Sequence, residues 1–167
     1  MKGEMVLEQG LESGKERSPR AEERRGMWRS LSLRGRADEK VETLRGVPLF
    51  RGLSTRELER IARHADLVNV EAGREILTEG SYSWEFLVIV EGTVRVQKAG
   101  KPLARLGPGA LLGGLAIVSG GPQVASYVSE TPVELLAFHP RSFWYVLDRT
   151  PELSRRVLAS LLMGWGL

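Results

Sequence analysis

The residues best suited to bind a ligand lie in one glycine-rich segment, residues 106–126. There, Gly113 and Gly114 directly precede Leu115–Val118, a stretch that can form one helical turn. A glycine-rich start to a helix presents backbone N–H groups beside the positive end of the helix dipole, which favours phosphate or another anion. Because similar glycine patterns are common in tight corners between strands, both interpretations stay open at this point. The polar side chains of the segment are those of Ser119, Gln123 and Ser126.

The composition excludes chemistry that depends on thiols or on clustered histidines. The chain has no cysteine, which rules out disulfides, thiolate metal sites and cysteine nucleophiles. Its two histidines, His64 and His139, lie far apart, and no nucleophile motif or metal-ligand spacing accompanies either one. We therefore expect no enzyme activity, no catalytic residues, no metal site and no required cofactor.

The charge is nearly balanced: the 167 residues include 24 basic and 21 acidic side chains, a formal net charge of +3. Arginines alternate with glutamates along the chain, whereas nucleic-acid-binding domains usually have a strongly basic face. Unbroken apolar runs, such as Phe86–Val90, are far shorter than the roughly 18 residues of a membrane span. The N-terminal residues also lack the apolar core of a signal peptide. We expect a cytoplasmic protein that contacts neither nucleic acid nor membrane.

The chain divides into a charged tail, residues 1–37, and one domain, residues 38–167. The tail has too few apolar side chains to offset the entropy of ordering it, so we expect disorder there. An apolar group interrupts this polarity and is either a loose patch or a short docking helix for a partner. Its members are Met27, Trp28, Leu31 and Leu33.

Helices are expected at both ends of the domain. The first carries Val41 and Leu44 and ends at Gly46–Pro48. Ser54 and Glu57 have the spacing of a capping box and begin a second helix. The apolar stripe of that helix is Leu58, Ile61, Ala62 and Ala65. Near the C-terminus we expect two more helices, one over Ser142–Leu147 and one with Thr150 as N-cap and Pro151 at its first position.

Between these helices the pattern is that of short strands. Apolar residues alternate or run together for a few positions, and glycines punctuate the runs at regular intervals. Such spacing is typical of an antiparallel sandwich or barrel. The expected strand residues are Val68, Val70, Ile76, Leu77, Phe86–Val90, Thr93–Gln97, Leu103–Leu106, Val124–Val128 and Val133–Phe138.

Several of these motifs together resemble the cyclic nucleotide-binding domain, the sensor module of catabolite activator protein and of cAMP-dependent kinase regulatory subunits. The resemblance runs from about Val41 to Leu162. Its motifs are Val47–Phe50 with Leu53 and Ser54, Val70–Gly73 with Ile76 and Gly80, Glu85–Val94, Leu106–Gly109, and Phe143–Leu147 with Pro151. The resemblance assigns a structural role to five glycines, Gly73, Gly80, Gly92, Gly107 and Gly109.

The resemblance implies an α+β fold: an antiparallel, jelly-roll-like β-roll of about eight strands, flanked by N-terminal helices and two C-terminal helices. It also implies a phosphate-binding cassette, whose glutamate holds the ribose 2′-hydroxyl and whose arginine pairs with the cyclic phosphate. This chain has Gly114 at the glutamate position and Gln123 at the arginine position, while Ser126 keeps a matching type. The cassette residues by resemblance are Leu112, Gly113, Gly114, Leu115, Ala116, Gln123, Val124 and Ser126.

The two departures predict weak or absent binding of cAMP and cGMP. A hydrogen bond to a charged group contributes about 1.5–3 kcal/mol. Loss of both contacts therefore weakens binding by roughly 3–6 kcal/mol, which is roughly 10²- to 10⁴-fold in affinity. The chain is then either a stand-alone regulatory module that senses a small molecule, or a ligand-independent interaction module.

The interaction hypothesis is supported by the loss of both charged ligand groups. Its partner or homodimer contact is expected at residues 151–163, whose apolar stripe from Leu153 to Leu162 is either domain core or a dimer seam. Trp165 is either a cap over a bound base or part of a frayed tail. A transcription factor is not expected, because too few residues follow Pro151 for a helix-turn-helix module.

Overall fold

Two antiparallel sheets form the centre of the molecule, in a computed structural model that describes residues 37–83 and 85–163. Each sheet has four strands within these residues. The first is ordered β1 (Ala65–Val70), β8 (Val133–Phe138), β3 (Phe86–Glu91) and β6 (Leu111–Leu112). The second is ordered β2 (Glu75–Leu77), β7 (Ser126–Ser129), β4 (Val94–Lys98) and β5 (Lys101–Leu106). The α+β β-roll implied by the resemblance is confirmed.

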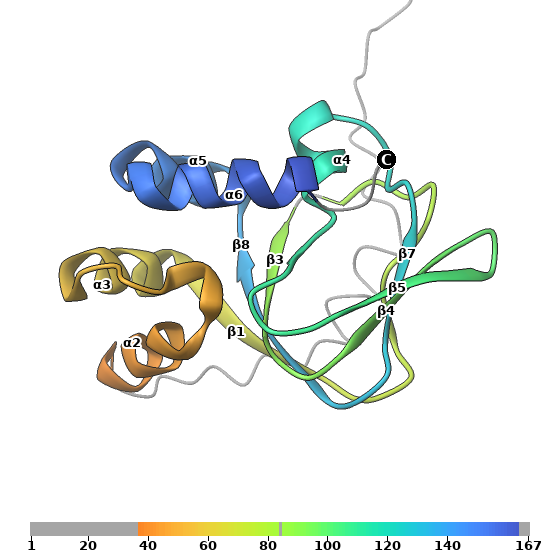
Figure 1. Cartoon of the computed structure of the whole chain (residues 1–167), viewed down its shortest axis with the longest axis horizontal. Coiled ribbons are helices and arrows are strands. Elements are labelled where there is room, and N and C mark those ends of the chain that lie inside the picture. The colour runs from red at the N-terminus through yellow and green to blue at the C-terminus, as the bar shows by residue number, and fades with distance from the viewer. Residues whose placement is uncertain (1–36, 84, 164–167) are drawn as a thin grey trace, which may run out of the picture.

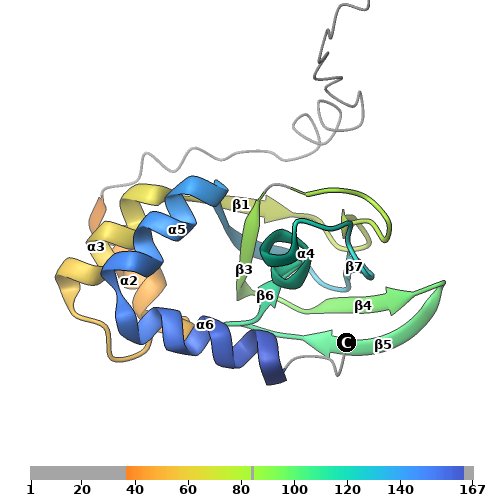
Figure 2. The same ribbon diagram turned by 90° about the horizontal axis from the view of Figure 1, so that it is seen from above.

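Helices gather at one end of the roll. Figure 1 shows three of them beside the sheets: α2 (Ala37–Gly46), α3 (Thr55–His64) and α5 (Pro140–Arg149). A 3₁₀ turn, η1 (Pro48–Phe50), joins α2 to α3. The last helix, α6 (Pro151–Met163), extends from this group toward the short helix α4 (Gly114–Ser119). Figure 2 shows the hairpin of β4 and β5 pointing away from the helical end.

The described helices include none with the length and apolar character needed to cross a bilayer.

The N-terminal helices follow the local signals in the sequence. The helix around Val41 and Leu44 ends at Gly46, as predicted. At the start of α3 the capping box is complete: Ser54 Oγ accepts from the Glu57 N–H at 3.3 Å, and the Ser54 N–H donates to Glu57 Oε2 at 2.7 Å. This backbone hydrogen bond from Ser54 is the main reason that the pKa of Glu57 is lowered. Of the four predicted apolar residues of this helix, Leu58, Ile61 and Ala62 are buried in α3. Ala65 is also buried, but it is the first residue of β1 and not part of the helix.

Two apolar clusters hold the elements together. One joins the helices to the β1–β8–β3 sheet, and within it the rings of Phe86 on β3 and Phe143 on α5 are stacked with centroids 3.7 Å apart. The other fills the space between the two sheets and includes Leu87, Leu112 and Leu135. Burial of such side chains contributes about 1.5–3 kcal/mol each, so both clusters contribute strongly to the stability of the fold.

Three local expectations need correction. The fifth helix begins at Pro140 rather than Ser142, because His139 caps it by accepting from the Arg141 N–H at 3.3 Å. Leu111 and Leu112, in the glycine-rich segment, form a short strand that was not predicted. Thr150 precedes α6, but its hydroxyl is buried without a hydrogen-bond partner among the described residues, so the predicted side-chain cap is wrong.

Some predictions fall on residues that the structure does not describe. The charged tail lies outside the described residues, except for Ala37, where α2 begins. The apolar group between Met27 and Leu33 lies outside them as well, and so does Trp165.

Candidate functional site

The glycine-rich segment folds as a short strand followed by a helix. Strand β6 pairs with β3, with Leu112 opposite Leu87, and Gly113 then turns the chain with φ of +66°. Because L residues with side chains rarely adopt this conformation, glycine suits the position. Helix α4 starts at Gly114, and Gly120 ends it with a φ of +69° and a backbone N–H that donates to the carbonyls of Ala116 and Ile117. A glycine-rich start to a helix is therefore present where the sequence indicates it.

The approach to this segment is held by backbone contacts. The Gly109 N–H donates to the Ile89 carbonyl at 2.8 Å, and the Ala110 N–H donates to the Gly107 carbonyl at 3.1 Å. Gly109 has φ of +89°, and a Cβ atom there would lie 3.1 Å from Cβ of Pro48 in η1. These contacts fix the path of the chain into the cassette against the N-terminal helical turn.

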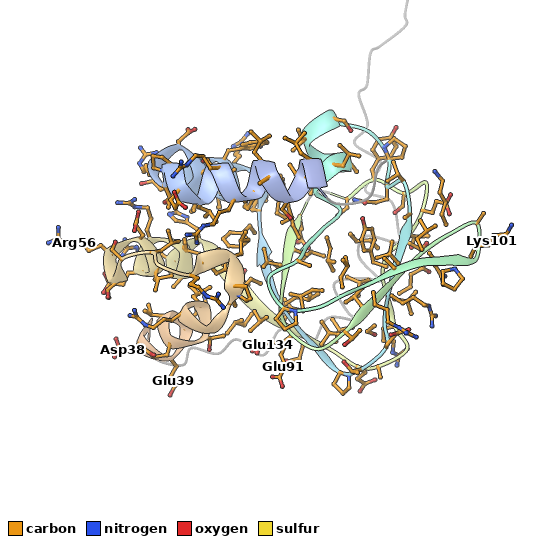
Figure 3. The ribbon with its side chains drawn as sticks, viewed as in Figure 1. Asp38, Glu39, Arg56, Glu91, Lys101 and Glu134 are labelled. Carbon is orange, nitrogen blue, oxygen red and sulfur yellow. The ribbon has the colours of Figure 1, made fainter. Side chains whose placement is uncertain are left out.

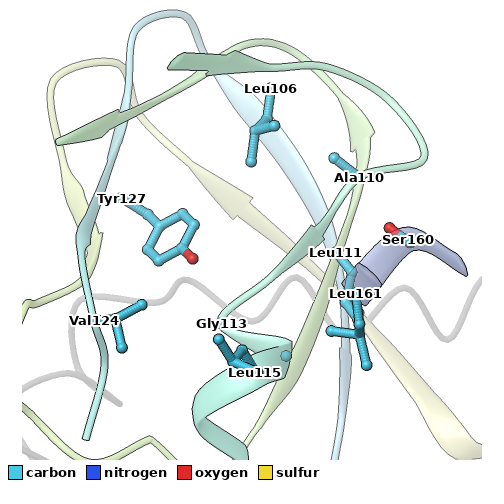
Figure 4. A pocket seen from close by; sticks show the side chains of 10 residues that line it. Leu106, Ala110, Leu111, Gly113, Leu115, Val124, Tyr127, Ser160 and Leu161 are labelled. Atoms are coloured by element: carbon cyan, nitrogen blue, oxygen red, sulfur yellow. The ribbon is translucent and has the colours of Figure 1, made fainter. Parts of the chain in front are cut away.

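A cavity of about 90 Å³ opens between α4, the strands and the end of α6 (Figure 4). Its walls are mostly aliphatic, and the hydroxyl groups of Tyr127 and Ser160 are the polar side-chain groups among them. None of the described residues that line it has a charged side chain. The lining residues are Leu106, Ala110, Leu111, Gly113, Gly114, Leu115, Val124, Tyr127, Ser160 and Leu161.

Half of the cassette residues named from the sequence line this cavity. They are Gly113, Gly114, Leu115 and Val124. The other four are packed elsewhere: Leu112 is in the core between the sheets, Ala116 and Gln123 are buried, and Ser126 Oγ accepts from the Glu79 N–H at 2.9 Å. Ser126, which keeps the residue type of the family, therefore stabilises the turn that follows β2.

Sequence reasoning missed the far wall of the cavity. Ser160 and Leu161 come from α6, and Tyr127 comes from β7. No local pattern distinguishes Leu161 from the other leucines of α6, because its place depends on how the helix lies across the roll. The aromatic side chain of Tyr127 is the one signal that sequence reasoning passed over, since it stands beside Ser126 in a segment already assigned to the cassette.

Gln123 is the most unusual polar residue of the site. Its backbone is fully paired: its N–H donates to the Ser81 carbonyl at 2.8 Å, and its carbonyl accepts from the Gly80 N–H at 2.7 Å. Its side chain is 2% exposed, and neither amide atom has a hydrogen-bond partner among the described residues. A Cβ atom added to Gly113 would lie 2.7 Å from Gln123 Nε2, so the amide lies directly behind the turn of the cassette.

The electrostatics of the site are those of a neutral pocket. Burial raises the pKa of the Tyr127 phenol, and a hydrogen bond with the backbone of Gly113 partly opposes this shift. The phenol is therefore uncharged at neutral pH. This hydrogen bond places the Tyr127 side chain of β7 against Gly113, the residue at which the cassette turns into α4.

Charged side chains are engaged elsewhere. Arg105, which the chain carries just before the cassette, donates to Glu130 at 2.8 Å, and Arg95 donates to the same carboxylate at 3.5 Å. Arg141 is exposed on α5. In Figure 3 the labelled charged side chains, such as Arg56 and Lys101, lie at the outer edges of the molecule. No described arginine or lysine lines the cavity.

The acidic side chains of the described ranges form no group of three or more that, with histidine, is placed to hold a metal ion. Glu91 and Glu134 face each other across β3 and β8. Burial raises the pKa of Glu134, and the neighbouring Glu91 carboxylate adds to that shift. This pair lies away from the cassette, as Figure 3 shows, and contributes nothing to its charge.

Comparison with known proteins gives a consistent assignment. Residues 67–150 match the sequence model of the cyclic nucleotide-binding domain. The chain is 34% identical over 108 residues to a cyclic nucleotide-gated potassium channel of Mesorhizobium japonicum, covering 65% of this chain and 30% of the channel. It is 27% identical over 123 residues to the cyclic AMP receptor protein of Thermus thermophilus, covering 71% of this chain and 57% of the receptor.

Solved structures show the same likeness in three dimensions. A cyclic nucleotide-binding domain from Methylobacillus flagellatus superposes with a TM-score of 0.58 at 26% identity, covering 75% of this chain and 74% of that one. The catabolite activator protein of Thermus thermophilus gives a TM-score of 0.61 at 28% identity, covering 69% of this chain and 56% of that one. The chain thus spans about a third of the length of the channel and just over half of the length of the two Thermus thermophilus proteins.

Proposed function

The chain belongs to the cyclic nucleotide-binding domain family, and from this membership we propose that it is a regulatory module with weak or no affinity for cAMP and cGMP. The observation that carries the proposal is the neutral cavity, in which no described lining residue is charged. Gly114 supplies no group to hold a ribose hydroxyl, and Gln123 supplies no charge to a cyclic phosphate. The module regulates rather than catalyses in this proposal.

The free energy at stake is large enough to change the function. Charge-assisted hydrogen bonds contribute about 1.5–3 kcal/mol each, so a cassette without its two ionised groups loses roughly 3–6 kcal/mol of binding free energy. At ~1.4 kcal/mol per tenfold change, affinity falls roughly 10²- to 10⁴-fold. The volume of the cavity also supports weak nucleotide binding, because about 90 Å³ is smaller than the ~300–1,000 Å³ typical of small-molecule sites.

Calorimetric titration of the full chain with cAMP and with cGMP tests the proposal. We expect no saturable heat at micromolar nucleotide. The variant Gln123→Arg restores the cation, and Gln123→Met serves as its matched control, because it keeps the side-chain length without adding charge. Arginine should strengthen cAMP binding, whereas methionine should not. Micromolar affinity in the unmodified chain would contradict the proposal.

The second candidate function is a ligand-independent interaction module that dimerises through α6. Its support is the exposure of Leu158 (57%) and Leu162 (76%), which lie one turn apart on that helix. In this case the mass in solution, measured by sedimentation velocity, should correspond to a dimer at micromolar concentration. The variant Leu158→Glu should then dissociate it, because a carboxylate at the centre of an apolar seam is not solvated. A monomer at all concentrations would exclude this candidate.

A further inference from the structure

Leu161 occupies the place in the cassette that a side chain at position 114 would need. A Cβ atom added to Gly114 would lie 2.8 Å from Cδ2 of Leu161 and 2.6 Å from Cδ2 of Leu111. Leu161 also lines the cavity, on the wall opposite Tyr127 and Val124 (Figure 4). We infer that Leu161 is a specificity-determining residue: it occupies the cassette from within the chain and must leave before a nucleotide-sized ligand enters. This inference rests on the proposed role of the cassette as the ligand site.

The position of Leu161 is set by contacts near the other end of α6. Arg156 donates to the Leu49 carbonyl at 3.1 Å and also to the Arg51 carbonyl, which ties α6 to η1. Ser154 Oγ donates to the Leu147 carbonyl at 2.8 Å, which ties α6 to α5. These contacts hold the first half of the helix, so its second half is directed toward α4. Leu161, which is partly buried, then packs against the apolar cluster that joins the helices to the β1–β8–β3 sheet.

The obstruction at the cassette consists of movable groups. The three atoms nearest to a Cβ at Gly114 belong to the side chains of Leu111 and Leu161, and none is a backbone atom. A leucine side chain on the last turns of a helix moves when that helix swings or unwinds, whereas a sheet backbone does not. Leu161 is the part of this obstruction that the docked helix supplies, whereas Leu111 belongs to β6.

This arrangement makes ligand binding and α6 docking compete for one space. A ligand that binds only when the cassette is open has an apparent Kd equal to its intrinsic Kd divided by the fraction of molecules in which the cassette is open. The competition also works in reverse: a ligand in the cassette displaces Leu161 and releases the end of α6. Leu103, 48% exposed on β5, does not line the cavity and provides a control of the same residue type.

The absence of cysteine from the chain allows a direct test. A single thiol is introduced as Ala110→Cys, on the cavity wall, and its reaction rate with a small thiol reagent is measured in the full chain. Adding Leu161→Ala should raise that rate about tenfold, because the open fraction grows as the docked contact is lost. Adding Leu103→Ala should leave it unchanged. Equal rates in the two backgrounds would overturn the inference.

A second control separates local opening from a general loss of stability. Leu58→Ala removes a fully buried side chain on α3, in a part of the core remote from the cassette. If Leu58→Ala accelerates the reaction of the thiol as much as Leu161→Ala does, the effect is global unfolding and the inference is wrong. If only Leu161→Ala accelerates it, the cassette is occupied as inferred.

Restoring the ionised anchors distinguishes this inference from the proposed function. The double variant Gly114→Glu with Gln123→Arg is titrated with cAMP, with and without Leu161→Ala. We expect Leu161→Ala to tighten binding about tenfold, since the new glutamate no longer meets the leucine. If the double variant binds equally well with Leu161 in place, the inference fails while the proposed function stands. If neither variant binds cAMP, the missing anchors do not explain the weak affinity that the proposed function assumes, and the thiol rates decide the role of Leu161.

Discussion

The turn at Gly92 and the cassette at Gly114 both leave no room for a side chain, but for different reasons. A Cβ atom at Gly92 would lie 2.3 Å from the carbonyl oxygen of Pro132, and the residue has φ of +94°. At Gly114, by contrast, the nearest atoms are the ends of two leucine side chains, and φ is not positive. The first glycine is required by the backbone of the β-roll, and the second by two side chains, Leu111 of β6 and Leu161 of the docked helix α6.

This difference indicates at which of the two glycines the surrounding atoms can move apart. The turns at Gly92 and Pro132 are held together by hydrogen bonds from the Glu130 N–H to the Thr93 carbonyl and from the Thr93 N–H to Thr131 Oγ1, each 2.9 Å long. Their backbone cannot shift without loss of such bonds, whereas side-chain ends move by rotation about single bonds. The rigid turn therefore belongs to the scaffold, and the cassette is closed by groups that can be withdrawn. Substitutions at the two places should separate these roles.

The largest effect is expected for Gly92→Ala. The methyl group meets a fixed carbonyl in a left-handed conformation, so we expect a loss of about 2–5 kcal/mol in the free energy of unfolding. Gly73→Ala is the matched control, because Gly73 also has positive φ (+77°) but no atom within 4 Å of its Cβ position. Its cost should be about 1 kcal/mol, from backbone strain alone. Urea unfolding measures both, and equal losses would show that the carbonyl does yield.

Gly114→Ala should cost about 1 kcal/mol, because overpacking against two leucines is partly offset by the better helix propensity of alanine. In a Leu161→Ala background this cost should disappear. A double-mutant cycle measures the coupling, expected at ~1 kcal/mol for residues in contact. A coupling near zero would mean that Leu111 alone closes the position.

Gln123→Met should stabilise the fold by up to about 1 kcal/mol, because it replaces two unpaired buried amide atoms with an apolar chain of similar length. The paired Ser126 gives the opposite expectation. Ser126→Ala removes the hydrogen bond to the Glu79 N–H and should cost about 1 kcal/mol. Thermal unfolding compares the two, and a destabilised Gln123→Met variant would show that the amide has a partner in solution.

The smallest effect concerns the alkaline limit of stability. The folded-state pKa of Tyr127 is raised above its ordinary value of 10.0, so the folded chain holds this proton more tightly than the unfolded chain does. Its contribution is complete below pH ~10 and is lost as pH rises through the folded-state pKa. Tyr127→Phe should therefore lose less stability than the unmodified chain above pH ~10. Parallel pH profiles of the two proteins would contradict this.

Much of the scaffold was predictable from neighbouring residues. The capping box of Ser54 and Glu57 satisfies backbone N–H groups within one turn, so its energy does not depend on distant parts of the chain. Glycine turns and alternating strands are local in the same sense. The strand pattern predicted an antiparallel sandwich or barrel, and the family resemblance implied the β-roll. The hydroxyl of Thr150 shows the limit of such reasoning, because tertiary packing buried it away from the N–H groups that it was expected to cap.

The features of the site likewise divide into those given by the sequence and those given by tertiary packing. The sequence alone shows that the cassette has uncharged residues at positions 114 and 123. That Leu161 fills the space beside Gly114 was decided by the tertiary structure alone. A contact between residues so far apart in the chain exists only after the sheets have closed and Arg156 has fixed α6 across them. Local sequence determines which groups a site offers, and the packing of distant elements determines which of them are free to act.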